Sequence, residues 1–212
     1  MTRRLPPLLR RLRVAVTRFA RDNRGSMTVE AALVLPLWIW GYTMSYQFFD
    51  AFREQAINLR AAYTISDMIS READAIGPSY IGDLHDMFDY LTRTNHPTWI
   101  RVSSVYYDTS AKVYKRYWSY STSSDYPAHS DTSITAEKDR LPNMLLGETV
   151  VLVETGMLYE PVLNVGLADM WYTNFIPTRP RFASTVEYNS TKCRLPNGAP
   201  PPPAALHRPC AR

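Results

Sequence analysis

The chain has 212 residues and a formal net charge of +4. This charge is unevenly distributed: residues 1–25 contain eight arginines and one aspartate, a net charge of +7, so residues 26–212 carry −3. The basic balance therefore belongs to the N-terminal leader and not to the body of the protein. An arginine-rich terminus can bind nucleic acid, but an apolar run follows this one directly, so we expect no nucleic-acid partner.

The apolar run extends from Met27 to Phe49 and contains one charged side chain, Glu30. A helix needs about 20 residues to cross the hydrocarbon core of a bilayer. Aromatic residues, which favour the membrane interface, gather in the second half of the run: Trp38, Trp40, Tyr42 and Tyr46. We therefore predict one transmembrane helix over residues 26–49. A buried core helix is the alternative, and the lack of charge and the basic flank argue against it.

The basic leader also predicts the orientation of this helix. Positive charge beside a membrane segment stays on the cytoplasmic side, so residues 50–212 are expected on the opposite side. A cleaved secretory signal is the alternative. The apolar run is longer than the roughly 7–15 residues usual in a signal peptide, and no small-residue cleavage site follows it. We therefore expect a retained anchor.

The residues around Glu30 form a more specific pattern, R-F-A-R-D-N-R-G-S-M-T-V-E-A-A-L-V-L-P-L over residues 18–37. A glycine followed by a small residue, with glutamate at the fifth position, resembles the N-terminus of TadE/TadG-like proteins. These proteins are the minor pilins, or pseudopilins, of the tight-adherence (Flp) pilus assembly system. Ala31 stands where the major Flp pilins have tyrosine, so the chain resembles the pseudopilins more than the pilus subunit.

The resemblance implies roles for three residues. A prepilin peptidase would cut between Gly25 and Ser26, and Glu30 would pair with the free N-terminus of a neighbouring subunit. It also implies a bacterial inner membrane, a periplasmic domain and other pilus-assembly proteins as partners. Common type IV pilins have phenylalanine at the position of Ser26, so an uncut chain stays an alternative. An alternative role for Glu30 is to stabilise the start of its own helix, because an acid near the N-terminal end of a helix is favourable.

Beyond the apolar run, the pattern predicts an α+β domain with a mostly antiparallel sheet. The amphipathic pattern continues the first helix to about residue 76, where Gly77-Pro78 is a stop signal. The resemblance implies a pilin-like shape with this helix packed on the head, although its length alone could equally make a stalk. A second helix is predicted over residues 81–91. Strands are expected over 99–108 and 112–120, joined as a hairpin by a turn at residues 108–111. The other expected elements are a loop over 121–135, a short helix over 136–146, a central strand over 148–159, a short helix over 162–171 on the sheet or near the membrane, and a last strand over 181–188.

Residues with catalytic or metal-binding chemistry form no motif. The sequence lacks H-E-x-x-H, C-x-x-C and phosphate-loop patterns, and its four histidines are scattered without a nucleophile–base spacing. His85 and Asp89 lie four residues apart and could share a metal, although a solvated acidic helix face is far commoner. We therefore expect no catalytic residue, no metal and no cofactor.

The C-terminal residues 194–212 are rich in proline and are expected to be extended or disordered. Cys193 and Cys210 both fall in the part expected in the periplasm, where an oxidising environment favours a disulfide between them. Two free thiols, or a bridge between neighbouring subunits, are the alternatives. The expected organisation is a basic cytoplasmic leader (1–25), a transmembrane helix (26–49), a periplasmic α+β domain (50–193) and a proline-rich tail (194–212).

These features together predict a non-catalytic component of Flp pilus assembly that acts by membrane insertion and lateral association. The main alternative is a generic signal-anchored periplasmic protein that binds a partner or supports the envelope. An anchored enzyme is the least expected class.

Overall fold

The structure is a computed structural model that describes residues 17–18, 26–145, 147–163 and 166–190. The chain divides into two compact units, Met1–Phe48 and Phe49–Arg212. We call the second unit the head. The long helix α2 (Ser26–Ser70) begins in the first unit and ends in the head.

The C-terminal part of α2 is amphipathic and packs into the core of the head. Four of its side chains are buried there: Ala61, Ala62, Ile65 and Ile69. The helix was expected to reach residue 76, and that boundary is wrong. The helix ends because the backbone carbonyl of Ser70 accepts a hydrogen bond from the Arg181 N–H, and Ile76 pairs with Tyr188 in a parallel bridge. Long-range contacts thus shorten the helix.

Helix α3 (Pro78–Thr92) confirms the second predicted helix and is longer than expected. The Gly77-Pro78 pair starts it: Gly77 is the N-cap and Pro78 occupies the first turn, where a missing N–H costs nothing. The predicted apolar stripe is buried at Ile81, Leu84 and Phe88. This stripe holds α3 against the same core as α2.

The sheet has four antiparallel strands in the order β2-β1-β3-β4. Their bounds are β1 (Thr98–Asp108), β2 (Val113–Ser121), β3 (Thr149–Tyr159) and β4 (Met170–Thr178). The predicted hairpin is confirmed: the Asp108 carboxylate accepts hydrogen bonds from the N–H groups of Ser110 and Ala111 and closes the turn. The predicted central strand is confirmed as well, because β3 lies between β1 and β4 and is buried along almost its whole length.

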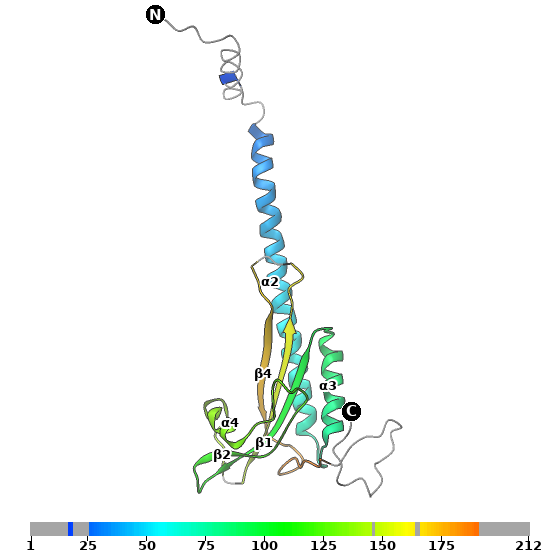
Figure 1. The fold of residues 1–212 in the computed structure, drawn as a ribbon, viewed down its shortest axis with the longest axis vertical. Helices are drawn as coiled ribbons and strands as arrows, with labels where there is room; N and C mark the ends of the chain where they lie inside the picture. Colours follow the sequence, from blue (N-terminus) through cyan, green and yellow to red (C-terminus); the bar gives the residue numbers. More distant parts are fainter. Residues whose placement is uncertain (1–16, 19–25, 146, 164–165, 191–212) are drawn as a thin grey trace, which may run out of the picture. The chain divides into compact units, whose positions relative to one another are not determined.

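The two faces of the sheet have different covers. On one face, α2 and α3 pack on apolar residues of β1 and β3, including Ile100, Val102 and Val153 (Figure 1). On the other face, the segment of residues 130–145 covers a smaller core. It contributes three apolar side chains, Ile134, Leu141 and Met144. The head is therefore an α+β fold with a pilin-like arrangement of a long N-terminal helix on an antiparallel sheet, as predicted.

The predictions for the segment between β2 and β3 were wrong in detail. A helix, α4 (Asp131–Ala136), lies almost wholly in the expected loop. The described part of the expected helix of residues 136–146 contains the end of α4 and a 3-10 turn, η2 (Lys138–Arg140). Helix α4 starts at a reciprocal cap in which Ser130 and Ser133 each bond the other's backbone N–H. The usual capping signal has Glu or Gln at the second of these positions, which is why the pattern was missed.

The last strand was also misplaced. The strand is β4, and the residues expected to form it, 181–188, contain only the bridge at Tyr188. Pro177 in β4 disfavours a strand assignment, but β4 is an edge strand and an edge tolerates proline. The expected helix of residues 162–171 is wrong too: its described part is loop until β4 begins at Met170.

A close contact in the sheet gives a first prediction. The Trp99 indole lies over Gly156, and a Cβ atom at Gly156 would stand 2.1 Å from Trp99 Nε1. Gly156→Ala should therefore destabilise the head by about 1–3 kcal/mol through overpacking. Urea unfolding of the full chain in detergent, followed by near-UV circular dichroism, measures this change.

Gly82→Ala in α3 is the matched control. No atom lies within 4 Å of a Cβ at Gly82, and alanine favours a helix over glycine by about 1 kcal/mol. We expect the control variant to be as stable as the parent or more stable. Equal unfolding midpoints for the two variants would contradict the packing of Trp99 on Gly156.

Candidate functional site

The N-terminal part of α2 is the candidate functional site because its apolar surface is uncovered. Trp38 is 74% exposed and Phe49 is 76% exposed. Other large apolar side chains of the same run are exposed as well: Met27, Val29, Leu33, Val34, Leu35, Leu37, Ile39, Trp40, Tyr42, Tyr46 and Phe48. Soluble monomers rarely expose so large a contiguous apolar surface. The helix is long and apolar enough to cross a membrane.

Two hydroxyl groups within this run are satisfied by the helix itself. The Thr43 hydroxyl donates to the carbonyl of Ile39 at 2.7 Å, and the Ser45 hydroxyl donates to the carbonyl of Gly41 at 2.9 Å. Hydrocarbon offers no hydrogen-bond partner, so a side chain that bonds its own helix avoids the cost of an unpaired group. This arrangement suits a lipid environment.

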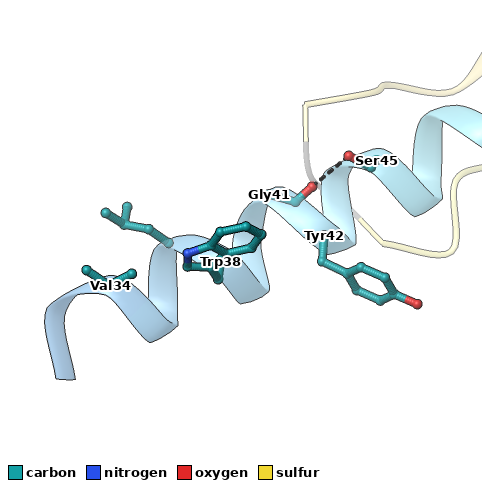
Figure 2. A pocket seen from close by; sticks show the side chains of 6 residues that line it. Val34, Trp38, Gly41, Tyr42 and Ser45 are labelled. Carbon is teal, nitrogen blue, oxygen red and sulfur yellow. Dashed lines mark hydrogen bonds between the residues drawn. The ribbon is translucent and has the colours of Figure 1, made fainter. Parts of the chain in front are cut away.

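An open groove of about 550 Å³ lies along one face of this run. Figure 2 shows its lining residues in succession on α2, with the Ser45–Gly41 hydrogen bond. The lining residues are Val34, Leu37, Trp38, Gly41, Tyr42 and Ser45. Nothing lies within 4 Å of a Cβ at Gly41, so the backbone is bare there. Small residues of this kind allow membrane helices to approach closely.

Glu30 lies on the face that carries this groove, since it precedes Val34 by one helical turn. Its side chain is exposed, and no described residue forms an ion pair or hydrogen bond with it. The helix is described from Ser26, so Glu30 lies beyond the first turn, which contains no acid. The favourable effect of the helix dipole falls off within that turn. Local stabilisation of the helix start is therefore the weaker explanation of Glu30.

The other predicted site residues belong to segments with little or no description. Gly25, Cys193 and Cys210 lie outside the described residues, and Ser26 is described only as the first residue of α2. The cleavage at Gly25–Ser26 and the disulfide between Cys193 and Cys210 stay predictions.

A charged cluster inside the head was not predicted from the sequence. Arg101 on β1 donates two hydrogen bonds to the Glu154 carboxylate on β3, at 2.7 and 2.8 Å. His129 Nε2 lies 2.7 Å from the same carboxylate, and its Nδ1 lies 2.8 Å from the Ser133 hydroxyl of α4. Glu154 is 6% exposed. The cluster thus joins two strands to the segment that covers them.

The electrostatics of this cluster indicate a structural role. Burial alone would raise the pKa of Glu154, but hydrogen bonds from His129 and Arg101 and their positive charge outweigh burial and hold the pKa below its ordinary value. Glu154 therefore stays an anion with both partners in place. No local pattern in the sequence indicates this cluster, because its three members are far apart in the chain.

His85 and Asp89, the pair considered for a metal, both bond the hydroxyl group of Thr98. Thr98 donates a hydrogen bond to Asp89, and its hydroxyl lies 2.8 Å from His85 Nε2. His85 and Asp89 themselves are 4.0 Å apart. This trio connects α3 to the start of β1. Among the described residues, no three His, Cys, Asp or Glu side chains are grouped so as to hold a metal.

Comparison with models of protein families, with curated proteins and with solved structures gave no match. The class of the protein is therefore defined by its own features. The part of the chain that the structure describes contains one exposed apolar helix with an acid near its N-terminal end, and that helix continues into an α+β head.

The buried cluster generates a prediction about pH. The pKa of Glu154 is lower in the folded head than its ordinary value of 4.5, so the carboxylate stabilises the head at pH values above 4.5. This stabilisation is lost as the pH falls below 4.5 and passes through the pKa of the folded state. Glu154→Gln should destabilise the head at pH 7 by about 3–5 kcal/mol, because Arg101 and His129 lose their anion. Urea unfolding at pH 7 and at acidic pH measures both effects.

Glu137→Gln is the matched control, since the Glu137–Arg140 pair lies on the surface with side chains 32% and 55% exposed. Its loss should cost less than about 1 kcal/mol. If Glu154→Gln cost no more than this control, the cluster would not hold the head together.

Proposed function

We propose that the chain is a membrane-anchored, non-catalytic, pilin-like component of a tight-adherence (Flp) pilus assembly system. The observation that carries the proposal is Glu30, a lone carboxylate on the exposed apolar part of α2. It stands at the fifth position after Gly25 in the segment that resembles TadE/TadG-like proteins. The pilin-like head supports the same class.

Glu30 would act as a registration device between subunits. A carboxylate inside a membrane costs about 2.5–3.5 kcal/mol on insertion scales, so it is rarely left without a partner. Cleavage after Gly25 would create a free amine at Ser26, which a neighbouring Glu30 could bind. A buried ion pair is stabilising only while both partners are present. A subunit placed out of register would leave Glu30 without a partner and would be disfavoured.

The groove beside Glu30 supports lateral association of α2 with other helices. Hydrocarbon gives helices no hydrophobic drive to associate, so contact depends on close packing. Gly41 and Ser45 offer a bare stretch of backbone, and Trp38 and Tyr42 offer bulky groups at its sides. The partners would be other pilus-assembly proteins within the inner membrane.

The proposed location is the bacterial inner membrane, with the leader in the cytoplasm and the head in the periplasm. The +7 charge of residues 1–25 supports this orientation, since basic flanks stay inside. Removal of the leader would take away the charge that fixes the orientation, so cleavage would follow insertion. A prepilin peptidase would perform that cut.

A second candidate is a generic signal-anchored periplasmic protein that binds a partner or supports the envelope. Ser26 favours it, since common type IV pilins have phenylalanine at this position. In this case the leader would be retained and Glu30 would have no terminal amine to meet. The state of the N-terminus separates the two candidates.

The orientation can be tested with a fusion. Alkaline phosphatase fused after Asp108 would follow the β1 strand and should be active, because the enzyme folds only in the oxidising periplasm. A fusion after Thr17, before the apolar run, should be inactive. A phosphatase that is stably produced after Asp108 but inactive would overturn the proposed orientation.

Processing can be tested by N-terminal sequencing of protein extracted from membranes. If the chain is cut, the mature protein starts at Ser26, and Gly25→Phe should leave the slower-migrating precursor because the peptidase needs a small residue there. A wild-type protein that retains Met1 in the presence of a prepilin peptidase would favour the generic anchored protein.

Glu30→Gln separates processing from assembly. We expect this variant to insert and to be cut as the parent is, but to form fewer cross-links with neighbouring subunits in the membrane. Unchanged cross-linking would contradict the registration role.

A further inference from the structure

The two strand ends that flank the β3–β4 loop contact α2 at neighbouring residues. The Tyr159 hydroxyl, at the end of β3, lies 3.2 Å from the Asp50 carboxylate, and the Tyr172 hydroxyl, near the start of β4, donates to the carbonyl of Ala51. Both strands therefore reach the level of Asp50 and Ala51. In the sequence, these residues directly follow Phe49, the last residue of the apolar run.

The direction of the strands is fixed by a second contact further along the helix. Ser66 of α2 forms a hydrogen bond with Thr178, which pairs with Val151 of β3. The helix rises about 24 Å from Asp50 to Ser66, and the strand rises about 26 Å from Val151 to Tyr159. The two lengths agree. Because the end of β3 lies beside Asp50 and its beginning lies at the level of Ser66, β3 runs antiparallel to α2. The end of β3 is therefore at the beginning of the part of α2 that belongs to the head.

The loop that follows has an unusual surface for a water-exposed turn. Val162 is 81% exposed and Leu163 is 41% exposed. No charged residue occurs from Pro161 to Ala168, and charges stand only at its borders, Glu160 and Asp169. Turns in water are normally rich in polar residues. An aromatic residue adjoins the loop at the start of β4, where Trp171 is partly exposed.

We propose that Val162 and Leu163, at the start of the β3–β4 loop, form a second membrane contact and insert into the interfacial region of the bilayer next to the end of the apolar run. The partner is the lipid itself. Apolar side chains favour the headgroup and acyl boundary, and a neighbouring tryptophan favours the same depth. The bordering acids stay in water. The head would thus be held to the membrane at two points, which restricts its rotation and tilt.

This inference rests on the membrane anchoring proposed above, and the experiment separates the two. The full chain carries one polarity-sensitive fluorophore on a cysteine at Val162→Cys or Leu163→Cys, with Cys193 and Cys210 replaced by serine. Leu35→Cys reports on the apolar run. Ser110→Cys reports on the β1–β2 turn, which lies at the opposite end of the sheet because Thr98 pairs near the end of β3. The proteins are reconstituted in liposomes with iodide on both sides.

We expect the labels at residues 162 and 163 to shift to the blue, to lose intensity in bilayers with brominated acyl chains and to resist iodide. The label at residue 110 should show the reverse. If labels 162 and 163 respond to iodide as label 110 does, while label 35 is quenched by brominated lipid, the loop contact is wrong and the anchor stands. If label 35 is also unquenched by lipid, the anchor itself fails. Protection of labels 162 and 163 from both quenchers would mean that protein covers the loop, and would overturn the lipid contact.

Discussion

The structure depends on one constraint, which is that a single helix must satisfy two different surroundings. Between Met27 and Phe49 its large apolar side chains are mostly exposed, and the hydroxyl groups of Thr43 and Ser45 bond carbonyls of the same helix. Beyond that run the same helix presents Ala61, Ile65 and Ile69 to the sheet. A helix bonds most of its backbone groups internally in both surroundings, so no change of secondary structure is needed where they meet. The fold of the head follows from the second half of this helix, which supplies one side of its main core.

The opposite face of the sheet solves a different problem. The segment of residues 130–145 is too short and polar to cover that face by apolar burial alone, and only a small core forms beneath it. The cluster of Arg101, Glu154 and His129 adds directional bonds between this segment and the two central strands. Such a cluster fixes the position of the segment more than it adds stability, because its charges lose hydration on burial.

Local patterns were sufficient for much of the fold. The apolar run, the stripe of α3, the hairpin at Asp108 and the buried strand β3 each have a signal within a few residues, and each was predicted. The errors came where distant residues decide the outcome. Helix α2 ends early because Arg181 bonds the carbonyl of Ser70 and Tyr188 pairs with Ile76 just beyond the helix. Strand β4 forms despite Pro177 because it is paired with only one other strand. The Glu154 cluster brings together residues that no short pattern connects. For the candidate site, the sequence identified Glu30, and the structure added the groove that shares its face.

The strand order β2-β1-β3-β4 leaves part of the head uncovered while the chain is being synthesised. Synthesis proceeds from the N-terminus, so α2, α3 and the β1–β2 hairpin exist before β3 has been produced. Until Thr149–Tyr159 arrives, one edge of β1 has unpaired backbone groups and the apolar side chains of α2 and α3 lack most of their cover. Open strand edges beside apolar surface are prone to aggregation. Attachment to a membrane would keep such half-made heads apart, since molecules held by one helix meet in fewer orientations than free ones. The nascent head then completes its sheet as β3 pairs with β1 and the later β4 adds to the free edge of β3.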